Sequence, residues 1–267
     1  GNARKRHFVM KIIFIIMGEQ PPRHKKIKGL EMYFDKKITE LFAQNEKNEK
    51  NFRVASILDR VAMCEISILQ DPILVAELGG GAHPDRYDRL FARILKKPQG
   101  KIDWVDVSPY MLEMAKKYVD IGKYKKRKSV IRFVESDLIQ YLRDAPDVSI
   151  DLVLMKYTID HIQDIETLFV LLLKKLKPNG RLVATIGVLS PELKSISTNA
   201  RFLYQGKEFP ENETRTLSDG ESFGVQFLKK SGDLSAGYLE GAKTEKYYHS
   251  SETMIRLGTK YGFEVVL

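Results

Sequence analysis

The chain has 267 residues, 43% of them hydrophobic, and a formal net charge of +9. This composition supplies enough apolar material for a large globular domain and excludes an intrinsically disordered chain. Cys64 is the only cysteine, which excludes a disulfide framework and a multi-cysteine zinc site and is typical of a reducing compartment. We therefore expect a cytoplasmic protein in which Cys64 is a core residue.

Most of the positive charge lies in two segments. Residues 1–28 and 116–132 each contain eight Lys or Arg against one acid, so the rest of the chain is mildly acidic. A nucleic-acid partner is possible but not favoured, because the basic surface is not continuous. We expect the cluster KYKKRK at 123–128 to be a solvated loop, with a phosphate or partner contact as the alternative.

Residues 1–70 are expected to form an N-terminal extension with helices that pack on the core. The run FVMKIIFIIM at 8–17 imitates a signal peptide, but Lys11 interrupts it, it is too short to span a bilayer, and no small-residue cleavage site follows. We expect no membrane span there. Helices are predicted at 32–50 and 51–70, of which the second is amphipathic and ends before Pro72.

Residues 71–267 alternate short apolar runs with longer amphipathic stretches. This alternation predicts an α/β fold, a doubly wound, mostly parallel Rossmann-like sheet with helices on both faces. The predicted strands are 73–78, 101–107, 130–135, 150–155 and 180–187, and the predicted helices are 84–97, 109–120, 138–143 and 162–176.

Three glycines follow the first of these strands, in VAELGGGAHP. In a parallel sheet, ligands bind at the carboxyl ends of the strands, and glycine lets the backbone approach a ligand closely or form a tight turn. A nicotinamide-dinucleotide fingerprint is disfavoured, because Pro84 stands where its third glycine belongs.

The tips of the next two strands carry carboxylates. Asp106 ends its strand and can accept both hydrogens of a ribose diol, and Asp137 lies in reach of an adenine amino group. Ser108 and Pro109 are suited to begin the helix after Asp106. Three strand tips are therefore expected to converge on one nucleoside.

Together these motifs resemble the class I S-adenosylmethionine-dependent methyltransferases. The resemblance covers residues 73–187 and returns at 246–266, through ELGGGA, VDVSPYMLEMAKKY, VESDL, DLVLMKYTIDHI and LKPNGRLVATI. It implies S-adenosylmethionine as the cofactor and S-adenosylhomocysteine as the product. His83 departs from the family pattern, since it replaces the customary third glycine.

The resemblance also implies which residues bind the cofactor. Glu77 and the glycine loop would hold its methionine part, Asp106 its ribose, and Asp137 the adenine edge. The implied cofactor-binding residues are Glu77, Gly79, Gly80, Gly81, Asp106, Val107, Asp137, Leu138 and Lys156.

A general base is needed only if the accepting atom carries a proton. His161 is the first candidate, because an imidazole titrates near neutral pH. Tyr157 is the second, together with the pair Tyr248-His249, and a purely structural role is the alternative for each. No motif in the sequence suggests a metal.

Residues 188–245 form a connection far longer than is usual between a strand and a helix, and we predict that they cover the substrate. An antiparallel hairpin that completes the sheet or makes a homodimer contact is the alternative. The family usually ends with two strands, of which the sequence supplies one at its end. Segments 8–16 and 223–228 are the candidates for the other.

The predicted activity is methyl transfer from S-adenosylmethionine to an O, N or C atom of a small molecule. No Asn/Asp-Pro-Pro-aromatic box follows the fourth strand, and Cys64 lies too early for attack on cytosine C5. An RNA or protein methyltransferase and a non-enzymatic S-adenosylmethionine-binding protein are the alternatives.

Overall fold

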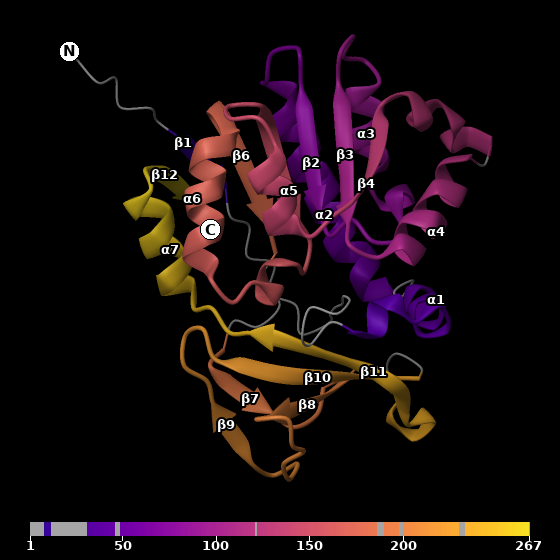
Figure 1. Ribbon diagram of the computed structural model, residues 1–267, viewed down its shortest axis with the longest axis vertical. Coiled ribbons are helices and arrows are strands. Elements are labelled where there is room, and N and C mark those ends of the chain that lie inside the picture. Colours follow the sequence, from indigo (N-terminus) through magenta and orange to yellow (C-terminus); the bar gives the residue numbers. More distant parts are fainter. Residues whose placement is uncertain are drawn as a thin grey trace.

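The computed structural model describes residues 8–11, 31–45, 49–120, 122–185, 190–197, 200–229 and 233–266. Its centre is a five-stranded sheet in the order β4-β3-β2-β5-β6, in which every neighbouring pair is parallel (Figure 1). The strands are β2 (Leu74–Leu78), β3 (Lys101–Asp106), β4 (Ile131–Glu135), β5 (Ile150–Met155) and β6 (Leu176–Ala184). The predicted α/β sheet is confirmed.

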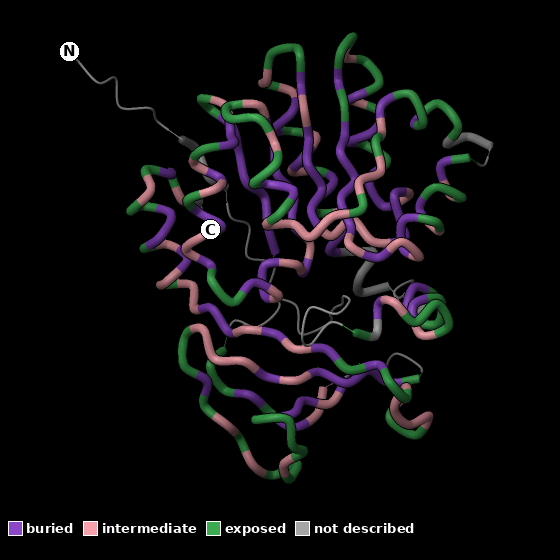
Figure 2. Tube along the Cα trace, in the orientation of Figure 1, coloured by how far each residue is buried: buried purple, intermediate pink, exposed green. Residues whose placement is uncertain are grey.

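Helices cover both faces of this sheet. Along β2, Val75 packs with α2 (Glu49–Ser67), α3 (Asp88–Ile94) and α4 (Pro109–Asp120), whereas Ala76 and Leu78 pack with α5 (Leu138–Asp144), α6 (Ile165–Lys175) and α7 (Ser251–Lys260). Successive side chains of a strand point to opposite faces, so a sheet covered twice needs apolar residues at every position. Figure 2 shows the inner strands as largely buried and the edge strand β4 as more exposed.

Helix α2 presents a different face to the core than its sequence suggested. Its buried positions are Val54, Leu58, Ala62 and Ile66, a four-residue repeat, and Ile68 is exposed. Cys64 lies two residues from both Ala62 and Ile66, on the opposite side, and is exposed. The prediction that Cys64 belongs to the core is therefore wrong.

The strand at the far side of β6 comes from the N-terminus. Strand β1 (Phe8–Lys11) pairs in parallel with β12 (Phe263–Val266) and lies beside β6. The other candidate, 223–228, belongs to a separate sheet. The chain thus extends its central layer by joining its two ends.

Residues 190–197, 200–229 and 233–247 form a second layer, which we call the lid. Its main sheet is antiparallel and contains β8 (Ala200–Tyr204), β10 (Ser222–Leu228) and β11 (Tyr238–Tyr247). Two short strands of the same region, β7 (Glu192–Lys194) and β9 (Thr214–Thr216), form a separate antiparallel pair. Figure 1 shows the lid beyond the ends of the central strands, with α1 (Lys36–Asn45) next to it.

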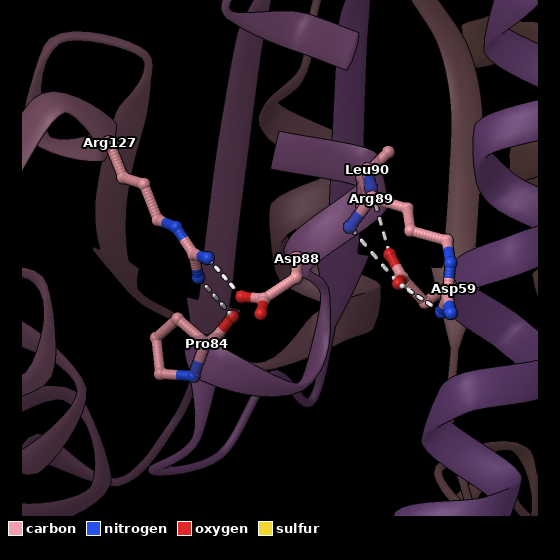
Figure 3. A network of polar contacts seen from close by, with 6 residues as sticks. All are labelled: Asp59, Pro84, Asp88, Arg89, Leu90 and Arg127. Atoms are coloured by element: carbon pink, nitrogen blue, oxygen red, sulfur yellow. Dashed lines mark hydrogen bonds and ion pairs between the residues drawn. The ribbon is translucent and has the colours of Figure 1, made fainter. Parts of the chain in front are cut away.

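The predicted helix at 84–97 is divided. A 3-10 turn, η2 (Pro84–Arg86), precedes α3, which ends at Ile94. The side chain of Tyr87 does not cap α3. Asp59 on α2 caps it instead, since its carboxylate accepts hydrogen bonds from the amides of Arg89 at 3.1 Å and Leu90 at 2.8 Å (Figure 3).

Arg127 holds the other side of this corner. It donates to the carbonyl of Pro84 at 3.0 Å, pairs with Asp88, and stacks over Phe91 at 4.7 Å (Figure 3). It belongs to η3 (Gly122–Ser129), the basic cluster, in which Lys125, Lys126 and Lys128 are exposed. The solvated-loop prediction thus describes these lysines but not Arg127, which is buried.

Removal of the Asp59 cap is expected to destabilise the fold. Asp59→Ala leaves two amides at the start of α3 without their acceptors, and the free energy of unfolding should fall by about 1–2 kcal/mol. Denaturant unfolding measures this loss. Asp144→Ala is the matched control, because Asp144 is exposed and should change stability by less than about 0.5 kcal/mol. Equal losses in the two variants would contradict the capping role.

Candidate active site

A cavity of about 360 Å³ lies at the carboxyl ends of β2, β3, β4 and β5. Its wall includes ten of the eleven residues proposed from the sequence, all except Glu77. Those ten are Gly79, Gly80, Gly81, Asp106, Val107, Asp137, Leu138, Lys156, Tyr157 and His161. A pocket of this size at the strand tips is where a parallel α/β sheet binds its ligand.

The glycine loop is shaped by contacts beneath it. Gly79 and Gly81 have φ values of +78° and +64°, in the left-handed region that favours glycine. A Cβ on Gly80 would lie 2.4 Å from the Trp104 ring, and one on Gly79 would lie 2.7 Å from Thr158. The loop therefore needs glycine for its own packing as well as for any ligand above it.

Asp106 braces this loop from the tip of β3. Its carboxylate accepts hydrogen bonds from the amide of Gly81 at 2.9 Å and the amide of Ser108 at 2.8 Å. Ser108 Oγ in turn accepts from the amide of Met111 at 3.2 Å and starts α4, as predicted. One buried carboxylate thus sets the distance between the glycine loop and α4.

Asp137 plays a similar part at the tip of β4. Its Oδ1 accepts from the amides of Ile139 at 2.8 Å and Gln140 at 3.0 Å, so that Asp137 caps α5. Leu138 and Ile139 line the same stretch of the cavity wall. The cap holds the adjoining backbone in place at the cavity.

Glu77 lies below the loop, at the end of β2, and is almost fully buried. Its Oε1 accepts a hydrogen bond from the Tyr87 hydroxyl at 3.1 Å. Its Oε2 has no hydrogen-bond partner among the described residues. Burial raises the pKa of Glu77 from 4.5 to about 7, although Lys156 and the Tyr87 hydroxyl both oppose the rise. Lys156, by contrast, lines the cavity, and its positive charge interacts with the Glu77 carboxylate.

Two candidate catalytic residues follow β5. Tyr157 has a φ of +56°, which is strained for a non-glycine residue, and its amide donates to Thr185 Oγ1 at 2.8 Å. His161 ends the 3-10 turn η4 (Ile159–His161) and is half-buried. Both line the cavity, and Tyr157 also packs in the core with α2 and α3.

Sequence reasoning missed the outer wall of the cavity. Tyr33 and Phe42, from η1 (Glu31–Phe34) and α1, and Tyr247, at the end of β11, contribute to it. Tyr247 lies two residues beyond the predicted cover, and its neighbours Tyr248 and His249 are not among the lining residues. The only hint in the sequence was that the neighbouring residues Tyr248 and His249 had been proposed as candidate bases.

The aromatic residues of the predicted cover do not reach the cavity. Phe202, Phe223 and Phe227 are buried within the lid itself, and Phe227 meets Phe42 of α1 edge-on at 5.5 Å. They hold the lid and α1 together as one unit. This unit carries Tyr33, Phe42 and Tyr247 to the cavity.

The described parts of the chain contain no cluster of His, Cys, Asp and Glu that could hold a metal ion. Within those parts, no helix is long and apolar enough to cross a membrane.

Comparison with known families identifies part of the chain. Residues 86–184 match the family described as "Methyltransferase domain". This stretch begins after the glycine loop and includes Asp106, Asp137, Tyr157 and His161. No curated protein matches the chain significantly.

Similar solved structures include the YcgJ protein from Bacillus subtilis, with 19% identity over 46% of this chain and 50% of that one and a TM-score of 0.36. A candidate S-adenosyl-L-methionine-dependent methyltransferase from Methanococcus maripaludis has 18% identity over 64% and 69% of the two chains and a TM-score of 0.44. The precorrin-6Y C5,15-methyltransferase from Geobacter metallireducens has 21% identity over 47% and 59% and a TM-score of 0.37. The chain spans about half to two thirds of the length of these proteins. Similarity at this level says nothing about the substrate of this chain.

The family match confirms the resemblance to the class I methyltransferases. The match is limited to residues 86–184, which resemble a methyltransferase domain, and S-adenosylmethionine is the methyl donor of the class I enzymes.

The raised pKa of Glu77 predicts how stability depends on pH. The folded state keeps the Glu77 proton up to about pH 7, whereas the unfolded state releases it near pH 4.5. The contribution of this group to stability is therefore full below pH 4.5 and is lost as the pH rises to about 7.

Glu77→Gln removes this titration but keeps an oxygen that accepts from Tyr87. Relative to the unaltered chain, the variant should gain up to about 3 kcal/mol in unfolding free energy between pH 4.5 and pH 8. Denaturant unfolding across that range measures the difference. Parallel pH curves for the two proteins would contradict the raised pKa.

Proposed function

We propose that the chain transfers a methyl group from S-adenosylmethionine to an O, N or C atom of a small molecule. The observation that carries this proposal is the cavity itself. One side of it consists of strand-tip residues suited to a nucleoside, and the other of Tyr33, Phe42 and Tyr247 from η1, α1 and the lid. Such a covered pocket suits a metabolite better than a long polymer.

The residues present fit the cofactor. Glu77 lies outside the cavity wall, but its buried Oε2 has no hydrogen-bond partner among the described residues and is assigned to an ammonium group held at the glycine loop. The ribose and the adenine amino group are assigned to Asp106 and Asp137, each of which already uses oxygens to brace local backbone. The glycine loop offers a surface without side chains, since a Cβ on Gly79 or Gly80 would collide with residues below it.

The bound cofactor supplies an electrophilic methyl group on a sulfonium. The protein has then to align the acceptor with that methyl and to exclude water. Tyr33, Phe42 and Tyr247 would form the water-excluding wall. His161 is assigned as the general base for an acceptor atom that carries a proton, because it lines the cavity and imidazole is the side chain that most often takes this role.

Nothing in the structure favours a nucleic acid at this site. The exposed lysines of η3 immediately precede β4, at the amino end of that strand, whereas the cavity lies at the carboxyl ends. Lys128 is also paired with Asp120 at 2.7 Å.

Calorimetric titration with S-adenosylhomocysteine tests the cofactor assignment. We expect a dissociation constant in the micromolar range and no binding of NAD. Asp106→Ala should weaken binding at least about tenfold, since it removes both the assigned ribose acceptor and the brace on Gly81. Glu135→Ala is the matched control, because this exposed carboxylate ends β4 outside the cavity wall.

Trp104 offers a second measurement in the same titration. It is the only tryptophan, and its Nε1 donates to the carbonyl of Gly81 at 2.9 Å. Its fluorescence should therefore change as the glycine loop takes up ligand, with the same midpoint as the heat signal. A screen of small-molecule acceptors with labelled S-adenosylmethionine then tests the substrate class. Cofactor binding without transfer to any acceptor would contradict the enzymatic proposal.

A further inference from the structure

The turn that carries His161 is attached on both of its sides to the end of the lid and the residues directly after it. We call residues 158–162 the His161 turn. Asp160, directly before His161, pairs with Lys246 of β11, and both side chains are almost fully buried, at 2% and 3% exposure. Ile162, directly after His161, accepts a hydrogen bond through its carbonyl from His249 Nε2 at 2.6 Å.

These two contacts come from one short stretch of chain, which also supplies Tyr247. Lys246 and His249 are three residues apart in sequence, and Tyr247 between them lines the cavity opposite the strand tips. The contacts therefore connect two parts of the cavity wall, the His161 turn and the end of β11, that are more than 80 residues apart in the chain.

The lid end of this connection is itself held firmly. Asp219, in the turn before β10, accepts from the Ser250 amide at 2.6 Å, the Ser250 hydroxyl at 2.7 Å and the Thr253 hydroxyl at 2.9 Å. The amide of Gly220 donates to the carbonyl of Tyr248 at 2.7 Å. The stretch that bears Lys246 and His249 is thus joined to both the lid and the start of α7.

A buried ion pair is costly to desolvate and is weak evidence for stability, whereas it does specify one arrangement of the groups it joins. If apolar residues replaced Lys246 and Asp160, the lid could still pack against the His161 turn, but no directional contact would fix the orientation of the turn. The carbonyl of Ile162 adds a second, directional contact on the other side of His161.

We propose that Lys246 and His249 are positioning residues, which orient His161 toward the cavity and set its place relative to Tyr247. This inference rests on the proposed function, in which His161 serves the acceptor. It makes the lid a fixed part of the catalytic site and not only a cover over it.

The test uses the full chain and two variants that interrupt the contacts separately. The double variant Asp160→Asn/Lys246→Met removes both charges, so that no unpaired charge is left buried. His249→Leu removes only the hydrogen bond to Ile162. Lys243→Met, an exposed lysine on the same strand, is the control, and Lys246→Arg and His249→Gln are the conservative replacements.

Two readouts report on the turn without any acceptor. The first is hydrogen exchange at the amides of His161 and Ile162, which donate to the carbonyls of Thr158 at 3.0 Å and Ile159 at 3.2 Å. The second is the NMR signal of the His161 ring, identified by its loss in His161→Gln. Binding of S-adenosylhomocysteine serves as the probe of the cofactor half of the cavity.

We expect both interrupting variants to speed exchange at these two amides about tenfold or more and to move the His161 ring signal. Affinity for S-adenosylhomocysteine should stay within about threefold of the unaltered chain, because the strand-tip residues are not disturbed. The control should match the unaltered chain, and the conservative replacements should restore most of the protection.

Unchanged exchange and an unchanged His161 signal in both interrupting variants would overturn the proposal, since the core alone would then hold the turn. If the double variant fails to fold, His249→Leu decides by the same criteria. Failure of the unaltered chain to bind S-adenosylhomocysteine would count against the proposed function instead, and leaves the exchange result to decide the positioning role.

Discussion

The site depends on one buried carboxylate, that of Asp106. Its two oxygens accept from the amides of Gly81 and Ser108, and so join the loop after β2 to the helix after β3. The amides of Gly79 and Gly80 donate to the carbonyl of Val105, one residue earlier on the same strand, at 2.8 and 3.0 Å. The glycine loop is thus attached along its length to the tip of β3, and its shape does not need a ligand to set it.

This arrangement explains why the loop contains three glycines in a row. Trp104 lies under the loop and donates to Gly81, which leaves no room for a side chain at Gly80. Thr158, after β5, fills the space under Gly79 and donates to the carbonyl of Leu78 at 3.0 Å. Side chains from β3 and from the turn after β5 therefore pack against the underside of the loop, and the loop backbone on the other side lines the cavity.

The meeting of the strand-tip residues at one cavity was predictable from the sequence because parallel strands end at one edge. Gly79, Asp106 and Asp137 come directly after apolar runs, so their meeting follows from strand order alone. The outer wall was not predictable in this way. Tyr33, Phe42 and Tyr247 reach the cavity through the packing of α1 on the lid, and such contacts between distant segments leave no periodic pattern in the chain.

Other misses have equally local causes. Cys64 was placed in the core because a free cysteine is usually buried, and its position alone could not tell which side of α2 faces β5 and β6. The strand beside β12 had two candidate segments, 8–16 and 223–228, and only the pairing of Phe8–Lys11 with Phe263–Val266 distinguishes them. In both cases the sequence defined the element and tertiary packing decided its partner.

The two halves of the cavity therefore differ in how they are held. The strand tips are fixed within one sheet and its loops by backbone amides that donate to the Asp106 and Asp137 carboxylates and to the Val105 carbonyl. The outer wall is fixed by side-chain contacts that this chain makes between the lid and the turn after β5, above all Lys246 with Asp160 and His249 with Ile162. Under the proposed function the methyl donor binds the first half, and differences in the acceptor then arise in the second. Substitutions at the lid contacts should then change which acceptors react and leave the choice of cofactor as it is.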